Sequence, residues 1–359
     1  MLPPALWPPL LFAAILGLHL LLPARHVTGY VSGPDGATLR YRLNGPLVLA
    51  VSVALWAFAC RQGWLAWDAF WLHRWELVAG ACVVGVVFSA WVVFREPPVA
   101  GRALPHQVWL GRAANPQWWG GRVDAKMFLY LVGAVVLELN VLSFAAHHVA
   151  TFPSDPSPGV FLYVGLFSFF VVEYLVFEQV HLYTWDFVAE GVGFKLGWGC
   201  FVFYPYFYGV GLWTQATTAN PHTPAPLLAG VALLFFTGWV LSRGANLQKY
   251  WFKRDPTKKA FGLLTPEALT APDGKRVLVS GFWGLSRHIN YLGELLMAMA
   301  LALSLGVPAA WGPWLYPLYY VVLLVPRQLD DDKRCAAKYG PLWDEYRRRV
   351  PRRIIPFVY

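Results

Sequence analysis

The sequence predicts an all-α polytopic membrane protein: a bundle of about nine or ten transmembrane helices with a cytoplasmic amphipathic helix at the C-terminus. Three observations lead to this fold class. Hydrophobic residues make up 57% of the 359 residues and charged residues only 14%, whereas an average soluble domain has about 25% charged residues. Apolar runs of spanning length recur along the whole chain. The chain also holds 19 Trp and 17 Tyr, side chains that concentrate at membrane interfaces.

The apolar runs define the predicted helices. A transmembrane helix needs about 20 predominantly apolar residues, and about nine stretches of the chain fit this length. The first stretch, Leu6 to Leu22, follows no basic leader and precedes no small-residue cleavage site, so we interpret it as a retained helix and not as a signal peptide. After Pro326 the chain becomes polar, and Leu329 to Arg349 is predicted to form the amphipathic helix.

One loop near the N-terminus has the pattern of a short β-hairpin. Residues Tyr30 to Gly45 read YVSGPDGATLRYRLNG, with the turn-forming tripeptide PDG at 34–36. Turn residues between two alternating runs predict paired strands. This segment therefore connects the first two helices as a hairpin.

The positive charge is concentrated in two stretches. The net charge of the chain is +9. Residues 243–276 hold eight Lys/Arg and three Asp/Glu, a net charge of +5, and residues 327–359 hold nine Lys/Arg and five Asp/Glu, a net charge of +4. These two stretches together account for the net charge of the whole chain. An excess of Lys and Arg marks cytoplasmic loops, which places both stretches and the C-terminus in the cytoplasm. They could also bind the phosphates of a cofactor. Nucleic acid is not an expected partner, because no basic patch lies on a soluble module.

Cysteine and histidine spacing gives no indication of a metal site. The four cysteines, Cys60, Cys82, Cys200 and Cys335, are far apart and form no CxxC motif. The chain has no HExxH motif either. We therefore expect no metal site and no disulfide framework.

The stretch LVSGFWGLSRHINYLGEL at 278–295 carries polar residues at the start of an apolar helix. Arg287, Asn290, Tyr291 and Glu294 have the spacing i, i+3, i+4 and i+7, which places them on one helix face. Such groups at the mouth of an apolar helix are costly unless they meet partners or a ligand. The alternative is a helix end that is anchored at the membrane interface.

Two other stretches carry charge at helical spacing. Arg327, Asp331, Cys335 and Tyr339 form one stripe, for which the alternative is a solvated helix with internal ion pairs. Lys249 and Lys253 share a face one turn apart after a spanning helix and could hold a phosphate group. Ordinary flanking charge is the alternative for the lysines.

Ionisable residues also occur within or beside the apolar stretches: Glu173, Glu178, Asp186, Glu190 and Lys195. Such residues are functional candidates by default, and a polar cluster that packs helices together is the alternative. The chain has neither GxGxxG nor GxxxxGK[ST], so any nucleotide would have to bind between membrane helices.

Taken together, these stretches resemble the family of sterol C14 and C7 reductases, which includes the sterol domain of the lamin B receptor. The resemblance covers 111–359, the predicted reductase core, and leaves 1–110 as N-terminal transmembrane helices and loops of the same integral membrane domain. It rests on GRAANPQWWGGRVDAKMF, DFVAEGVGF, PYFY, ANLQK, LVSGFWG followed by RHxNYxG, and the C-terminal RCAAKYGPLWDEYRRRVPRRIIPFVY. LVSGFWG and PDGKR at 272–276 are most similar to the 7-dehydrocholesterol reductase branch.

The resemblance implies a sterol substrate and NADPH as cofactor, with reduction of a ring double bond, at C7–C8 in the first instance and at C14–C15 in the second. An isolated ring alkene must be protonated before it accepts hydride, so the site needs an acid. The family's membrane tyrosine corresponds to Tyr208, our first candidate acid, with Glu190 and Asp331 in reserve. The family's cofactor residues correspond to Lys249, Lys253, Leu278, Trp283, Arg287, Asn290, Arg327, Asp331 and Tyr339.

The chain departs from the family at three places near the expected sterol cavity. Cys200 stands where an acidic residue is usual, 209–211 read GVG in place of TLQ, and Lys195 replaces an apolar residue. These departures leave open which double bond is reduced, with side-chain sterol reduction as an alternative. A non-catalytic sterol-binding scaffold, as some relatives partly are, is a separate alternative. A membrane methyltransferase of the isoprenylcysteine carboxyl type, using S-adenosylmethionine, is another alternative, but it would leave Lys249 and Lys253 without a phosphate.

The expected surroundings follow from this interpretation. The partners are the sterol and membrane lipid, and the sequence indicates no obligate protein partner. The membrane would be that of the endoplasmic reticulum in a eukaryote and the inner membrane in a bacterium.

Overall fold

The computed structural model describes residues 2–33 and 36–359. The chain forms two compact units, Met1–Asn220 and Pro221–Tyr359, which we describe in turn as unit 1 and unit 2. The compact units thus divide the chain at residue 220, whereas the family resemblance divides it at residue 110.

The helices confirm the all-α polytopic membrane class. Within the described residues, five helices are long and apolar enough to span a membrane: Pro4–Leu21, Arg74–Arg95, Ala125–Thr151, Pro158–Val176 and Ala225–Arg254. Gly45–Arg61 and Ile289–Ser304 are shorter apolar helices.

Unit 1 contains most of the helices. In chain order they are η1 (Pro4–Leu6), α1 (Trp7–Leu21), α2 (Gly45–Arg61), α3 (Ala69–Leu72), α4 (Arg74–Arg95), α5 (Leu104–Leu110), α6 (Ala125–Thr151), α7 (Pro158–Val176), α8 (Glu178–His181), α9 (Trp185–Val188), α10 (Phe194–Trp198), η2 (Gly199–Phe207) and α11 (Val210–Gln215).

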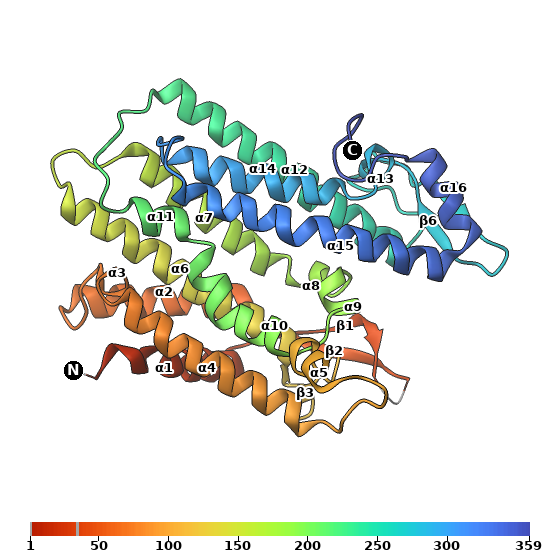
Figure 1. Ribbon diagram of the computed structural model, residues 1–359, viewed down its shortest axis with the longest axis horizontal. Helices are drawn as coiled ribbons and strands as arrows, with labels where there is room; N and C mark the ends of the chain where they lie inside the picture. The colour runs from red at the N-terminus through yellow and green to blue at the C-terminus, as the bar shows by residue number, and fades with distance from the viewer. Residues whose placement is uncertain (1, 34–35) are drawn as a thin grey trace. The chain divides into compact units, whose positions relative to one another are not determined.

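Helix α6 is the central helix of unit 1, and α1, α2, α3, α7 and η2 pack around it (Figure 1). A helix that is apolar all round is expected to be buried, and 89% of the apolar window of α6 is buried. Its first turn is capped by Asp124, whose carboxylate accepts hydrogen bonds from the backbone N–H groups of Lys126 and Met127 at 3.1 Å each. The cap satisfies two backbone donors at the helix start.

The predicted hairpin is confirmed, and it begins before Tyr30. Strand β1 (Arg25–Ser32) pairs antiparallel with β2 (Thr38–Leu43), and Arg25 lies opposite Leu43. Pro34 and Asp35 of the predicted turn lie outside the described residues. A second, very short pair joins β3 (Gln117–Trp118) to β4 (Val123–Asp124).

The stretch from Phe194 to Gln215 contains a π-helix. Helix α10 leads directly into the π-helix η2, which contains Pro205, and α11 follows after Tyr208. Proline removes one backbone N–H from the helix ladder. Asn140 of α6 stabilises this segment, because its Nδ2 donates a hydrogen bond of 2.7 Å to the Pro205 carbonyl oxygen.

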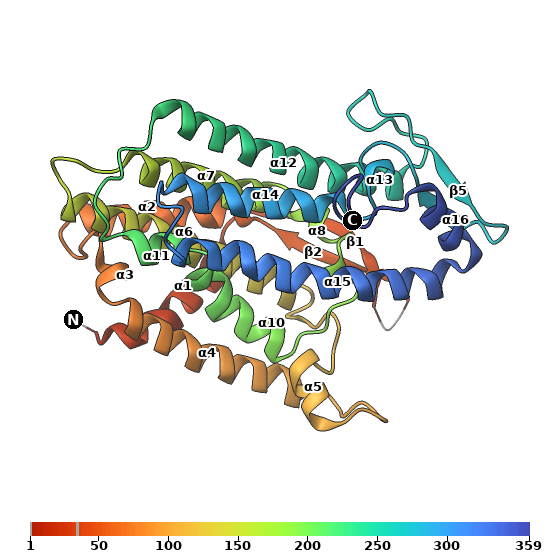
Figure 2. The ribbon, with the colours of Figure 1, turned by 45° about the horizontal axis from the view of Figure 1, so that its top comes forward.

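Unit 2 is built on three long helices and a small hairpin. Helix α12 (Ala225–Arg254) packs on α14 (Ile289–Ser304), which packs on α15 (Leu315–Tyr339), as Figures 1 and 2 show. The hairpin pairs β5 (Ala268–Thr270) with β6 (Arg276–Leu278). The remaining elements are α13 (Phe282–Leu285), η3 (Gly312–Trp314) and α16 (Pro341–Arg349).

The amphipathic helix predicted from Leu329 to Arg349 is not one helix. Its first half continues α15 without a break as far as Tyr339, and its second half is the separate helix α16. Gly340 has φ of 54°, a left-handed conformation that ends helices and favours glycine. Pro341 then starts α16 with a φ suited to the first helical position.

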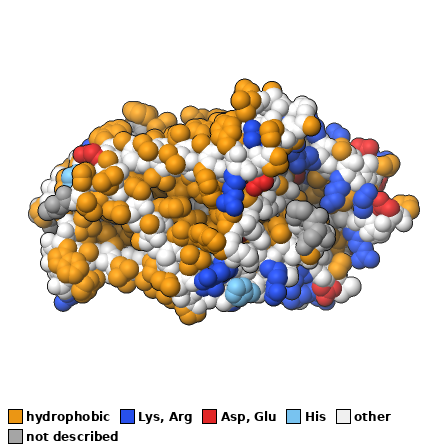
Figure 3. All heavy atoms as spheres, turned by 90° about the horizontal axis from the view of Figure 1, so that it is seen from below, with side chains coloured by type: hydrophobic (Ala, Val, Ile, Leu, Met, Phe, Trp, Pro, Cys, Tyr) orange, Lys and Arg blue, Asp and Glu red, His pale blue; other side chains and the backbone are white. Residues whose placement is uncertain are grey.

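The two basic stretches of the sequence meet at one end of unit 2. Strand β6 and helix α16 share a small core in which Val277 and Val279 pack against Trp343, Tyr346 and Val350. Arg349 lies 3.7 Å from the Glu267 carboxylate. Figure 3 shows one face of the molecule, where hydrophobic side chains cover a broad area and Lys and Arg gather at one end.

Candidate functional site

All nine residues that the resemblance assigns to the cofactor lie in unit 2. They occupy the last turns of α12, the segment from β6 to the start of α14, and the second half of α15. A hydrogen bond of 2.6 Å from Ser242 Oγ of α12 to Glu294 Oε1 of α14 holds the first two helices together. Helix α15 adjoins them through Asp331, which lies near His288 and Lys249.

The LVSGFWG segment is held by Gln248 of α12. Its Nε2 donates to the Ser280 carbonyl oxygen at 3.1 Å, and its Oε1 accepts from the Phe282 N–H at 3.0 Å. Gly281 between them has φ of 62°, and a Cβ there would lie 2.4 Å from Gln248 Nε2. Only glycine fits this turn. Gln248 was not among the predicted site residues, although it belongs to the ANLQK motif.

Trp283 is fixed from two sides. Its Nε1 donates to the Ala245 carbonyl oxygen at 2.8 Å, and its own carbonyl oxygen accepts from the Tyr346 hydroxyl at 2.9 Å. The Lys249 ammonium lies 5.0 Å from the centre of the Trp283 ring, within the range of a cation–π contact. The structure therefore brings together Trp283 and Lys249, two of the predicted cofactor residues.

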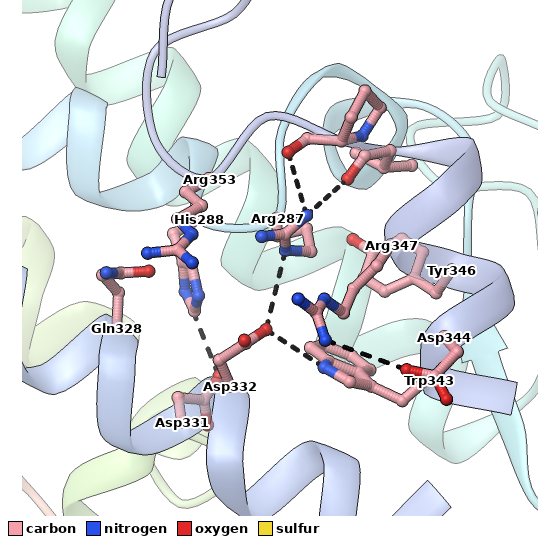
Figure 4. Close-up of polar contacts among 12 residues, drawn as sticks. Arg287, His288, Gln328, Asp331, Asp332, Trp343, Asp344, Tyr346, Arg347 and Arg353 are labelled. Carbon is pink, nitrogen blue, oxygen red and sulfur yellow. Dashed lines mark hydrogen bonds and ion pairs between the residues drawn. The ribbon is translucent and has the colours of Figure 1, made fainter. Parts of the chain in front are cut away.

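Arg287 binds the C-terminal segment of the chain. Its Nη1 donates to the carbonyl oxygens of Val350 at 2.8 Å and Pro351 at 3.0 Å, and its Nε lies 3.8 Å from Asp332 Oδ1 (Figure 4). The same Asp332 oxygen accepts from Trp343 Nε1 at 3.0 Å. Burial lowers the pKa of Arg287, and Asp332 opposes this effect. Asp332 was not predicted as a site residue.

His288 lies beside Arg287 and is almost fully buried. Its ring stacks on Tyr291 at a centroid distance of 5.0 Å, and its Nδ1 is 4.0 Å from Asp331 Oδ2. Burial, together with the positive charges of Lys249 and Arg287, lowers the pKa of His288 to about 3. The imidazole is therefore neutral at physiological pH, and the long contact with Asp331 is not a salt bridge.

Asp331 lies among cations from two helices. Burial raises the pKa of its carboxyl group, while Lys249 and Lys253 lower it. The pKa of the nearby Cys335 thiol is raised to about 12, mainly by burial and secondly by the negative charge of Asp331. Lys253 also lies within electrostatic reach of Lys249 and Lys338. The structure thus joins the lysine pair of α12 to the α15 stripe, as the resemblance implies.

The remaining predicted residues have different surroundings. Leu278 is buried in β6 opposite Ala268, and the Tyr339 ring stacks on Trp343 at 6.2 Å. Arg327 lies on α15 one turn before Asp331. Leu278 and Tyr339 therefore pack against neighbouring residues of unit 2.

Four buried polar atoms of the site have no hydrogen-bond partner in the described part of the chain. They are Arg287 Nε, His288 Nε2, Asn290 Oδ1 and Gln328 Oε1. Buried polar atoms are normally paired, so each unpaired atom needs an explanation. A bound polar ligand would supply partners. Neutral acceptors suit hydroxyl or amide donors, and the neighbouring lysines suit phosphate groups.

The two other candidate acids lie in unit 1. Tyr208 directly follows η2, where its ring packs against Tyr204 at a centroid distance of 4.9 Å. Its carbonyl oxygen accepts from the Tyr163 hydroxyl at 3.5 Å. A Cβ at Gly133 of α6 would lie 2.2 Å from the Tyr204 ring. The position of Tyr208 thus depends on α6, α7 and the π-helix.

Glu190 is paired with Lys195, another of the ionisable residues of the apolar stretches. Its Oε1 forms an ion pair of 3.0 Å with Lys195 Nζ, so Lys195 balances this buried carboxylate. Lys126 is fully buried, and its ammonium donates to the carbonyl oxygens of Asp186, Phe187 and Glu190 at 2.7, 3.2 and 2.6 Å. Three acceptors match the three donors of an ammonium group, so Lys126 fixes the DFVAEGVGF segment.

Unit 1 also has an apolar cavity of about 710 Å³ between α1 and α4. Its walls include Phe12 of α1, Val83 and Trp91 of α4, and Trp118 beside them. Cys200, by contrast, is buried against α6, where its carbonyl oxygen lies 3.1 Å from the Cβ position of Gly133.

Comparison with known proteins shows which family this chain resembles along its whole length. The model of the ergosterol biosynthesis ERG4/ERG24 family matches residues 7–359. A Delta(14)-sterol reductase of Arabidopsis thaliana is 33% identical over 94% of this chain and 91% of its own length. Those of Methylotuvimicrobium alcaliphilum and Mus musculus (TM7SF2) are also 33% identical, over 91% and 98% of this chain and 76% and 86% of their own lengths.

Proposed function

The chain belongs to the ergosterol biosynthesis ERG4/ERG24 family, and we propose that it reduces a ring double bond of a sterol with NADPH. The similar proteins from a plant, a bacterium and a mammal are all Delta(14)-sterol reductases, which favours the C14–C15 bond. The C7–C8 bond is the second candidate, because LVSGFWG and PDGKR are most similar to the C7 branch.

The charge arrangement in unit 2 is the observation that carries the cofactor proposal. Lys249 and Lys253 lie beside Asp331, and unpaired polar atoms of Asn290 and Gln328 occur on the adjoining helices. Phosphates would be held by the lysines, and hydroxyl or amide groups would bind the neutral acceptors. A bound nicotinamide would supply hydride to the carbocation. These residues fit such a group better than they fit S-adenosylmethionine, which has no phosphate.

The protein's own contribution to the chemistry is a proton and a dry environment. Tyr208 donates its phenolic proton to the alkene carbon, which leaves a carbocation on the neighbouring carbon. The ring of Tyr204, packed against Tyr208, can stabilise a nearby positive charge through its π face. The surrounding apolar helices exclude water, which would otherwise trap the cation. Glu190 is a weaker candidate for the acid, because it is paired with Lys195.

A sterol-feeding experiment tests this function. A host without sterol reductases of its own would express the chain and receive Δ14, Δ7 and side-chain-unsaturated sterols in separate cultures. We expect the Δ14 sterol to be consumed, with NADPH required in membrane extracts. Reduction of the side-chain alkene alone would contradict a ring reductase and would indicate that the Cys200 and Gly209–Gly211 departures redirect the substrate.

A further inference from the structure

A carboxyl group lies at the centre of the most buried membrane helix. Glu138 is thirteen residues from each end of α6 (Ala125–Thr151), and its side chain is 5% exposed. Its Oε1 accepts a hydrogen bond of 2.6 Å from Ser168 Oγ of α7. Its Oε2 is buried and has no hydrogen-bond partner among the described residues. None of the predicted functions uses this group.

The surroundings of Glu138 favour the neutral carboxylic acid. An ionised carboxylate in an apolar interior is very costly unless a cation or several donors compensate it. Glu138 has one hydroxyl donor, and none of the ion pairs within the described residues includes it. Ionisable residues inside a membrane are expensive and commonly mark proton pathways. These surroundings favour the protonated form of Glu138.

The α6 segment that carries Glu138 packs against the π-helix and against the residues next to Tyr208. From α6, Asn140 donates to the Pro205 carbonyl oxygen at 2.7 Å, and Leu137 Cδ1 lies 3.8 Å from the Cβ position of Gly209. From α7, the Tyr163 hydroxyl donates to the Tyr208 carbonyl oxygen at 3.5 Å. Glu138 thus lies on the segment of α6 that packs against the residues around Tyr208.

We propose that Glu138 returns a proton to Tyr208 after each turnover, a role that rests on the proposed function of Tyr208. When the Tyr208 O–H bond breaks, the proton forms a C–H bond on the sterol and a phenolate remains. The carboxylic O–H bond of Glu138 then breaks, the phenol forms again, and a carboxylate remains. Water restores the Glu138 proton as the product leaves. In water a phenol has a pKa about six units above that of a carboxyl group, and burial disfavours the phenolate and the carboxylate alike, so the proton moves from Glu138 to the phenolate.

The competing explanation is structural: the Glu138–Ser168 hydrogen bond could only join α6 to α7. Two variants separate the explanations. Glu138→Gln keeps the side-chain volume and the acceptor for Ser168 but removes the acid. Ser168→Ala removes the hydrogen bond and keeps the acid. Each would be assayed with enzyme in excess over sterol, which reports one turnover, and with sterol in excess, which reports kcat.

The proton-return role predicts a split between the two assays. Glu138→Gln should keep its single-turnover rate within about twofold, because Tyr208 still carries its first proton, and should lose about 10²-fold in kcat, the usual contribution of a positioned acid. Ser168→Ala should keep most of both rates. Full kcat in Glu138→Gln, or equal loss in both assays for both variants, would overturn the proposal.

Two further measurements keep the proposal testable if Glu138→Gln fails to fold. Glu138→Asp retains an acid and should keep most of its kcat, and loss of kcat with an intact single turnover there would count against the role. The infrared spectrum of the unaltered protein should contain a deuterium-sensitive band of a buried carboxylic acid, and its absence would overturn the proposal. Full activity of Tyr208→Phe would instead overturn the proposed acid itself, while the infrared band would still report the proton on Glu138.

Discussion

Gly238 of α12 and Gly293 of α14 bring the two helix backbones into direct contact: a Cβ at Gly293 would lie 2.4 Å from the Gly238 carbonyl oxygen and 2.5 Å from the Ser242 backbone nitrogen. Small residues permit such close approach between membrane helices. This crossing sets the relative position of the helix ends that carry Lys249 and Asn290.

Gly293→Ala should therefore destabilise unit 2 and loosen the cofactor site. The added methyl meets backbone atoms that cannot rotate away, and overpacking of this kind typically costs about 1–3 kcal/mol. We expect a lower thermal unfolding temperature in detergent and a higher KM for NADPH. Gly230→Ala is the matched control, because it lies in α12 with nothing within 4 Å of its Cβ position. If both variants unfold at the same temperature as the unaltered protein, the contact is not critical.

Lys249→Ala should weaken the binding of NADPH more than that of NADH. Lys249 lies over Trp283 and near Lys253 and Asp331, where a 2′-phosphate would find positive charge. We expect NADPH to be strongly preferred by the unaltered protein and the preference to shrink in the variant, as measured by kcat/KM with each cofactor. Lys259→Ala removes an exposed charge from the same basic stretch and controls for net charge. Equal use of NADH by the unaltered protein would contradict the assignment.

Tyr208→Phe should abolish turnover while sterol and NADPH still bind. The substitution keeps the ring that packs on Tyr204 and removes only the proton donor, so a fall in kcat of at least about 10²-fold is expected. Tyr206→Phe is the control, because Tyr206 is a buried tyrosine of the same π-helix. Loss of sterol consumption confined to Tyr208→Phe would support the acid, and normal turnover would transfer the role to Glu190 or Asp331.

His288 should make the protein less stable in mild acid. Its folded-state pKa of about 3 lies below the unfolded value of about 6.5, so the imidazole is held neutral in the folded protein. Its contribution to stability is complete above pH 6.5 and falls as the pH drops from about 6.5 toward 3, by about 2 kcal/mol at pH 5. The thermal unfolding temperature in detergent at pH 7 and pH 5 measures this. His288→Gln should reduce the difference, and an unchanged difference would show that His288 titrates normally.

A reporter fused after Tyr359 should be found in the cytoplasm. Both basic stretches lie at the same end of unit 2 and share one small core, so they face the same side of the membrane, and Lys/Arg excess marks the cytoplasmic side. A second reporter in the 255–266 loop should give the same answer. A lumenal or periplasmic signal from either fusion would separate the proposed cofactor site from the cellular supply of NADPH.

The sequence predicted the fold class because a membrane helix is a local feature, but it predicted nine or ten spans where five of the described helices are long and apolar enough to cross a membrane. A run of about 20 apolar residues is visible without any partner, and the hairpin around Tyr30 was predicted from its turn residues. The break at Gly340 was missed because Leu329 to Arg349 keeps a helical pattern of charges on both sides of one residue. The π-helix around Pro205 was missed as well, since it depends on the Asn140 amide of another helix.

For the candidate site, the sequence by itself determined which residue types recur at helical spacing, including the pair Lys249 and Lys253 and the face from Arg287 to Glu294. Only the tertiary structure decided what these residues contact. Arg287 donates to Val350, 63 residues away, and Glu138 meets Ser168, 30 residues away. Such contacts leave no periodic trace in either partner's own segment, because the energy of a buried polar group depends on atoms that folding brings from elsewhere in the chain.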